Sequence, residues 1–140
     1  MLQEKLISVH AKNMFANIAR AHRLCLIILY GSVARGTDTA MSDVDIGVMG
    51  HSPLSHEDES VIAEETARAL EIPQIEVRSL HRTSPLFLHQ VMNDGILLFA
   101  DTPARPQELR LYAWKIAIET RRLREQRYAG TKERINAYVR

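Results

Sequence analysis

The sequence has a single cysteine, Cys25, and almost no excess of charge of either sign. One cysteine cannot form an internal disulfide, and its place in the apolar run LCLIILY predicts a small buried thiol without a catalytic role. The net charge of +1 comes from 18 basic and 17 acidic side chains. A protein dedicated to nucleic acid is expected to be clearly basic, so we expect no direct nucleic-acid binding.

Long hydrophobic runs are also missing. No apolar stretch approaches the roughly 18 residues of a membrane span. The first residues, MLQEKLISVHAKNMF, are interrupted by charged side chains and contain no signal-peptide core. The expected location is therefore the reducing cytoplasm, without membrane contact. The six histidines have no spacing typical of metal ligands, and no P-loop, Gly-x-Ser-x-Gly or dinucleotide fingerprint is present.

The chain does have the length and composition of one soluble globular domain. It has 140 residues, of which 46% are hydrophobic and 25% charged, and we expect one domain over residues 1–140. Apolar spacing predicts helices over residues 2–22, 55–70, 84–93 and about 107–128, the last ended by Gly130. Strands are predicted over residues 24–30, 43–49, 74–80 and 96–100. Alternation of strands and helices predicts an α/β fold around a small sheet.

Residues 31–45, GSVARGTDTAMSDVD, carry the main functional signal. Asp43 and Asp45 are two residues apart in a predicted strand, so both side chains point to the same face. Two ionised carboxylates that close repel each other unless a cation neutralises them, although a solvent-exposed strand face would also accommodate them. Gly31-Ser32, after a buried strand, is often only a turn, but its backbone could also approach a phosphate. Mg²⁺ commonly binds carboxylates together with substrate phosphates, so the two features explain each other's charge.

A third acid is available on the next predicted strand. Two-metal sites for displacement at phosphorus generally need more than two carboxylates. Glu76 has Ile75 and Val77 as neighbours that point to the other face. Glu76 is therefore the candidate third acid, with a solvated strand glutamate as the alternative.

These residues resemble a known family. Gly-Ser, ten residues and then Asp-Val-Asp match the motif of DNA polymerase β-type nucleotidyltransferases. The sequence GSVARG…SDVDIGV and the short chain look most like the minimal nucleotidyltransferases, which are the MNT antitoxins paired with HEPN-domain toxins. The segment SPLFLHQVMNDGILLF is also similar, so the resemblance covers roughly residues 24–100. The family implies a polymerase β-like α/β (α+β) fold, with a small mixed sheet flanked by helices.

The resemblance also implies a set of roles. Asp43 and Asp45 would be catalytic residues that ligate Mg²⁺, with two ions expected, and Gly31 and Ser32 would hold the triphosphate of ATP. Glu76 stands where the family has its third carboxylate, commonly aspartate, as a metal ligand or general base. The implied activity is Mg²⁺-dependent transfer of AMP from ATP to a tyrosine hydroxyl of a HEPN ribonuclease toxin, which neutralises the toxin in a hetero-oligomer.

Other parts of the sequence leave alternatives open. Arg35 could contact a phosphate or be a surface arginine, and Ser42 could bind a phosphate or cap the turn before the strand. The apolar stripe of the last helix, defined by Leu111, Trp114, Ile118 and Leu123, could dock a partner or close over the sheet. An antitoxin that masks its toxin without chemistry is an alternative function. A nucleotidyltransferase for a small molecule is another, although 140 residues leave little room for an additional acceptor domain.

Overall fold

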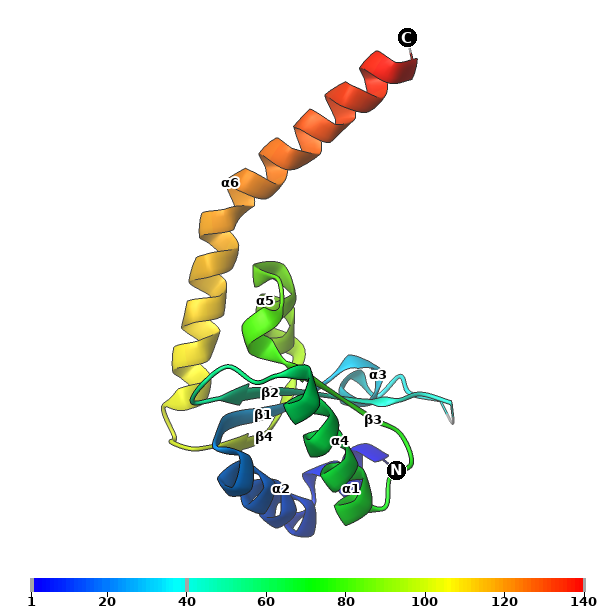
Figure 1. The fold of residues 1–140 in the computed structure, drawn as a ribbon, viewed down its shortest axis with the longest axis vertical. Coiled ribbons are helices and arrows are strands. Elements are labelled where there is room, and N and C mark those ends of the chain that lie inside the picture. Colours follow the sequence, from blue (N-terminus) through cyan, green and yellow to red (C-terminus); the bar gives the residue numbers. More distant parts are fainter. Residues whose placement is uncertain (1, 40, 140) are drawn as a thin grey trace.

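A computed structural model describes residues 2–39 and 41–139, and a mixed four-stranded sheet lies at its centre (Figure 1). The strands are β1 (Leu24–Tyr30), β2 (Val44–Gly50), β3 (Ile75–Ser79) and β4 (Ile96–Ala100). Their order is β3-β2-β1-β4, in which β1 is antiparallel to both β2 and β4, and β2 is parallel to β3. The four predicted strands and the mixed sheet are thereby confirmed, with bounds shifted by about one residue.

Helices cover both faces of the sheet. They are α1 (Leu2–Ile7), α2 (Val9–His22), α3 (Gly31–Arg35), α4 (His56–Leu70), the short 3-10 helix η1 (Leu80–Arg82), α5 (Pro85–Asp94) and α6 (Arg105–Val139). Helices α1, α2 and α4 lie below the sheet in Figure 1, whereas α5 and the first part of α6 lie above it. Among the described residues, no helix combines the length and the apolar character needed to cross a membrane.

The apolar run of β1 is explained by burial on both sheet faces. Ile27 and Leu29 point into the core shared with α2 and α4, where Phe15 and Ile62 are buried. Leu26 and Ile28 point into a second core under α5 and α6. A strand buried on both faces has no need of polar alternation, which is why LCLIILY is continuously hydrophobic.

Serine residues set the starts of several helices. The predicted helix over residues 2–22 is in fact two helices, because Ser8 ends α1 and caps α2, its Oγ accepting a hydrogen bond from the Ala11 N–H at 3.2 Å. Ser55 caps α4 as predicted, and Asp58 completes a reciprocal capping box with it. The side chain of Ser84 caps α5, which has Pro85 at its first position.

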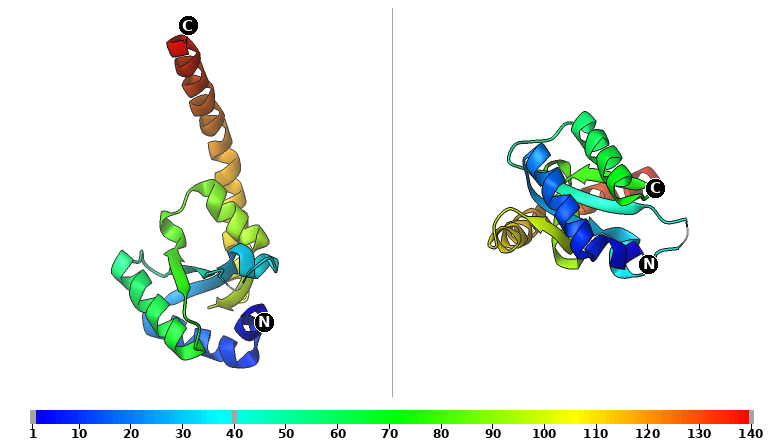
Figure 2. Two further views of the ribbon diagram at one scale, coloured as in Figure 1. Left: turned by 90° about the vertical axis from the view of Figure 1, so that its right-hand side faces the viewer. Right: turned by 90° about the horizontal axis from the view of Figure 1, so that it is seen from below.

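The last helix differs most from the prediction. Helix α6 continues through Gly130 to Val139, well beyond the predicted end at Tyr128, and its distal half projects away from the sheet (Figures 1 and 2). It bends where its colour passes from yellow to orange in Figure 1. Near this point the Thr120 hydroxyl donates to the carbonyl of Ile116 at 2.7 Å, and the Arg124 guanidinium donates to the carbonyl of Ala117 at 3.0 Å. Side-chain bonds of this kind to helix carbonyls promote bending.

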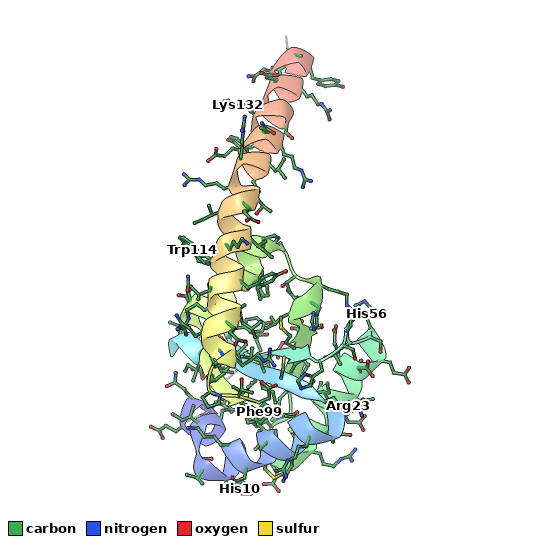
Figure 3. All side chains as sticks on the ribbon, turned by 90° about the vertical axis from the view of Figure 1, so that its left-hand side faces the viewer. His10, Arg23, His56, Phe99, Trp114 and Lys132 are labelled. Carbon is green, nitrogen blue, oxygen red and sulfur yellow. The ribbon has the colours of Figure 1, made fainter. Side chains whose placement is uncertain are left out.

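Small side chains hold α6 against the body. Ala113 and Ala117 are its buried residues, and Ala113 belongs to the core under α5. The four residues of the apolar stripe are 51–56% exposed, and Figure 3 shows Trp114 on the outer side of the helix. The alternative in which the stripe closes over the sheet is therefore wrong.

Candidate active site

The sheet topology brings three distant segments to one edge. Because β1 is antiparallel to β2 and β2 is parallel to β3, the end of β1 meets the starts of β2 and β3. Tyr30 is paired with Asp45, and Asp45 is paired with Glu76. Paired residues share a sheet face, so these side chains gather on the face covered by α5. The motif residues and the predicted third acid thus come from separate elements to one place.

Gly31 makes the closest approach in this region. It follows β1 directly, begins α3 and has a φ of +79°, a backbone conformation that favours glycine. A Cβ atom at this position would collide with Oδ2 of Asp45. The glycine of the motif is therefore required both by its own backbone and by the carboxylate beside it.

Asp45 is an unfavourably placed charge. Its side chain is half-buried, and this burial is the largest cause of the rise in the pKa of its carboxyl group. The carboxylates of Glu76 and Asp43 raise the pKa further, whereas the guanidinium groups of Arg78 and Arg35 lower it. Three acids and two arginines therefore influence one another here, and an added cation would relieve the repulsion among the acids.

Glu76 is held by an arginine that the sequence analysis did not identify. Its carboxylate lies 3.7 Å from Nη2 of Arg78, two residues along β3, and its side chain is 54% exposed. The Arg78 guanidinium lies over the ring of Phe87, 5.2 Å from its centroid. Phe87 in turn contacts Tyr30 edge to face, with 5.5 Å between centroids. These contacts link β1, α5 and β3 beside the carboxylates.

The sequence contains a signal for Arg78 but none for the contact between Phe87 and Tyr30. Arg78 could have been found, since side chains two apart on a strand share a face and a cation there balances Glu76. Nothing local in the sequence places Phe87 against Tyr30, because α5 and β1 meet only in the folded chain. Burial first of all raises the pKa of Tyr30 to about 12, so its hydroxyl stays protonated at neutral pH.

The structure places the remaining predicted residues as follows. Asp43 immediately precedes β2 and is exposed. Ser42 organises the loop before the strand, since its Oγ accepts a hydrogen bond from the Thr39 N–H at 2.8 Å. This contact favours the turn-capping alternative for Ser42. Arg35 ends α3 and is exposed, yet it is near enough to lower the pKa of Asp45. Ser32 is partly buried in α3.

The carboxylate region has the chemistry of a site for a hard cation. Among residues 2–39 and 41–139, no three His, Cys, Asp or Glu side chains are arranged to hold one ion by themselves. Mg²⁺, however, is usually bound by one or two carboxylates with oxygens from phosphates and water completing the shell. Asp43 and Asp45 supply such oxygens, and a cation beside Asp45 would offset the burial and the neighbouring acids that raise the pKa of its carboxyl group. The donor set therefore fits Mg²⁺ together with a phosphate-bearing substrate.

Two cavities flank Phe87 beside the carboxylates. One, of about 290 Å³, lies between α3 and α5 and includes Tyr30 and Gly31 in its wall. The other, of about 520 Å³, lies along β3 and includes Glu76 and Arg78. Space for ligands therefore lies beside Gly31 on one side of Phe87 and beside Glu76 on the other.

Comparison with solved structures shows the same fold in toxin–antitoxin complexes. A chain of a toxin–antitoxin complex with AMP-PNP matches with a TM-score of 0.70 at 24% identity, covering 89% of this chain and 98% of that one. A chain from the tri-AMPylated Shewanella oneidensis HEPN toxin in complex with MNT antitoxin matches with a TM-score of 0.65 at 21% identity, covering 96% and 99%. A search of curated protein sequences gave no match.

The family comparison covers most of the sheet and the site. Residues 13–103 match the family described as polymerase beta, nucleotidyltransferase. The matched range runs from α2 through β4 and contains Gly31, Asp45 and Glu76. The fold implied by the resemblance is confirmed, and the chain belongs to the polymerase beta nucleotidyltransferase family.

Proposed function

We propose that this protein is an MNT-type antitoxin that transfers AMP from ATP to a tyrosine hydroxyl of a HEPN ribonuclease toxin and thereby neutralises it. The observation that carries the proposal is the half-buried Asp45 carboxylate, packed against the backbone of Gly31 within the Gly-Ser-x10-Asp-x-Asp motif. Similar folds occur in complexes that contain AMP-PNP or a tri-AMPylated HEPN toxin, which supports ATP as substrate and such a toxin as partner.

The site residues divide into a nucleotide side and an acceptor side. Gly31 and Ser32 hold the triphosphate, with Arg35 as an additional cation near it. Asp43 and Asp45 hold Mg²⁺, two ions being expected, and Glu76 contributes the third carboxylate. Bound Mg²⁺ would supply the positive charge that neutralises these carboxylates and the phosphates and polarises the phosphorus under attack.

The reaction is a substitution at the α-phosphorus of ATP. The oxygen of the acceptor hydroxyl forms a new bond to this phosphorus, the bond to the bridging oxygen breaks, and pyrophosphate leaves. The hydroxyl proton passes to the carboxylate of Glu76, which its exposure leaves accessible to an incoming tyrosine. The chain's main contributions are positioning and charge compensation, as expected for transfer at phosphorus.

The partner binds through the apolar stripe of α6 in this proposal. The stripe leaves a tryptophan and three aliphatic side chains more than half exposed on a helix that extends beyond the body. Aromatic and aliphatic anchors of this kind are typical of stable protein interfaces. The single-domain organisation over residues 1–140 and the cytoplasmic location, where ATP is available, belong to the same proposal.

An antitoxin that masks its toxin without chemistry is the second candidate. It is favoured by the exposed, arginine-paired Glu76 and by the lack of a group of three acids arranged around one ion among the described residues. The two functions differ in whether the toxin is modified.

Radioactive ATP separates these candidates. The toxin is incubated with the protein, Mg²⁺ and ATP labelled at either the α- or the γ-phosphorus. Transfer of AMP predicts labelling of the toxin from the α position alone. Neutralisation of the toxin without any label would instead establish masking.

A further inference from the structure

A further cavity lies at the opposite end of the sheet from the carboxylate region. Its volume of about 610 Å³ is within the range of about 300–1,000 Å³ typical of small-molecule sites. The end of α2, the start of β1, the residue after β2 and the end of β4 form its wall. Strand β1 has seven residues and rises about 3.3 Å per residue, so about 20 Å separates this cavity from the carboxylates. The cavity is therefore distinct from the site of the proposed reaction.

Two backbone hydrogen bonds join the walls of this cavity. The N–H of His51 donates to the carbonyl of Arg23 at 3.0 Å, and the N–H of Asp101 donates to the carbonyl of Cys25 at 3.0 Å. Both carbonyls belong to the stretch where α2 passes into β1. The segments that follow β2 and β4 are thus fixed to the start of β1. A ligand would meet a pre-formed wall, which lowers the entropy cost of binding.

Two arginines line the cavity without a carboxylate partner. Arg20 donates to the carbonyl of Ala16 at 3.4 Å and to Oδ1 of Asn17 at 3.1 Å, both of which are neutral oxygens. The side chain of Arg23, which directly follows α2, makes no hydrogen bond or ion pair within the part of the chain that the structure describes. Both arginines are exposed, so their guanidinium groups are available to an anion.

The wall also contains a carboxylate, Asp101, whose charge is already balanced. Arg105 donates to its two oxygens at 2.9 and 3.0 Å, and Nε2 of His51 lies 3.5 Å from Oδ2. The charges of Arg20 and Arg23 therefore remain as a surplus of positive charge around the cavity. A cavity with this surplus selects for anions.

We propose that this cavity binds a small organic anion, with its phosphate or carboxylate group held by Arg20 and Arg23. Guanidinium groups match the oxygens of both kinds of anion through paired N–H donors. The apolar part of the ligand lies against Phe99, whose partly buried ring packs on the core next to α2. Figure 3 shows Arg23 and Phe99 on the same side of the molecule. This site does not depend on the proposed function.

Phenyl phosphate and benzoate are the probes, and their binding to the full chain is measured by calorimetry without Mg²⁺. Arg20→Gln and Arg23→Gln each remove one charge, and Ala16→Leu fills the cavity from α2. Each variant is expected to weaken binding about tenfold, since a hydrogen bond to a charged group or the space for the ligand is lost. The probe that binds wild type more tightly identifies the phosphate or the carboxylate as the preferred group. Weaker binding of inorganic phosphate than of phenyl phosphate would show the contribution of Phe99.

The matched controls are Arg35→Gln and Arg68→Gln, which remove exposed arginines at the carboxylate end of the sheet and on α4. Neither should change the binding of phenyl phosphate or benzoate. The site is wrong if wild type binds neither probe. It is also wrong if either control weakens binding as much as Arg20→Gln and Arg23→Gln do. Thermal melting of each variant identifies any loss that is due to unfolding.

Discussion

At the scale of single residues, the site is organised around one carboxylate. Asp45 is half-buried, touches the backbone of Gly31 and faces Glu76 across the β2–β3 pair. Placing a desolvated acid beside two further acids lowers the stability of the fold. The position is understandable if the carboxylate is to be completed by a cation and a triphosphate.

Asp45→Asn is expected to stabilise the protein in the absence of Mg²⁺. The pKa of Asp45 is raised in the fold, so the folded state keeps the proton to higher pH than the unfolded state does. The free energy of unfolding therefore falls as pH rises from the ordinary value of 3.8 through the raised pKa. Urea unfolding should show a higher free energy of unfolding for Asp45→Asn than for wild type at neutral pH. This difference should shrink as the pH falls toward that ordinary pKa.

The matched control is Asp101→Asn, for which the expected change in the free energy of unfolding has the opposite sign. Hydrogen bonds from Arg105, at 2.9 and 3.0 Å, lower the pKa of Asp101. The stability that this carboxylate supplies is present at neutral pH and is lost as pH falls through the lowered pKa. Asp101→Asn should thus destabilise at neutral pH. A loss of stability in both variants would contradict the description of Asp45 as a strained charge.

Gly31→Ala and Gly36→Ala separate backbone strain from the contact with Asp45. Both glycines have positive φ, +79° and +73°, for which an L side chain costs about 1–2 kcal/mol. A Cβ at Gly36 meets nothing within 4 Å, whereas one at Gly31 collides with Asp45. Urea unfolding should show the larger loss for Gly31→Ala, and calorimetry should show AMP-PNP binding only for Gly36→Ala. Equal behaviour of the two variants would refute a special role for the Gly31 contact.

The sequence was sufficient to predict the residues that local patterns define. The spacing of Gly31, Asp43 and Asp45 is a fixed motif, and strand alternation identified Glu76. Tyr30 and Phe87 were not found because their contact depends on how α5 packs over β1, and no local pattern encodes that packing. Ser42 was ambiguous in the sequence because a serine before a strand suits both a turn and a phosphate.

At the scale of elements, α6 differs most from its sequence pattern. Gly130 looked like a helix stop, but a glycine within a helix costs only about 1 kcal/mol relative to alanine. The helix therefore continues to Val139. From the sequence, its apolar stripe suited either the sheet or a partner; in the structure the stripe is exposed, and small side chains, Ala113 among them, make the close packing against α5. Pattern alone cannot decide which side of a helix faces the body when both carry apolar groups.

Ala113→Leu and Trp114→Ser test which side of α6 packs on the body. Ala113 is fully buried, so the larger leucine should cost about 1–3 kcal/mol in unfolding free energy. Trp114 is 55% exposed, so its replacement should change stability by no more than about 0.5 kcal/mol. Trp114→Ser should nevertheless weaken binding to the toxin in a pull-down titration. A large stability loss for Trp114→Ser with none for Ala113→Leu would reverse this orientation.

At the scale of the whole molecule, the fold is a four-stranded sheet with a cavity on each side of Phe87 and a long helix, α6, that projects from the body. The strand order β3-β2-β1-β4 places the motif of β1 and β2 next to the acid of β3. One cavity lies toward α5 and the other along β3, and Phe87 stands between them. The exposed stripe of α6 adds an apolar surface outside the body, to which the proposed function assigns the toxin. The arrangement suits an enzyme whose substrate is another protein.

The central claim is that this site attaches AMP to the toxin, and intact mass spectrometry of the toxin tests it directly. Purified toxin is incubated with Mg²⁺, ATP and either the wild-type protein or Asp45→Asn, which keeps the size of the side chain and removes its charge. The toxin is expected to gain the mass of one or more AMP groups with wild type and to gain none with Asp45→Asn, although both bind the toxin. A neutralised toxin of unchanged mass, or an equal gain in mass with both proteins, would show that this site does not attach AMP to the toxin.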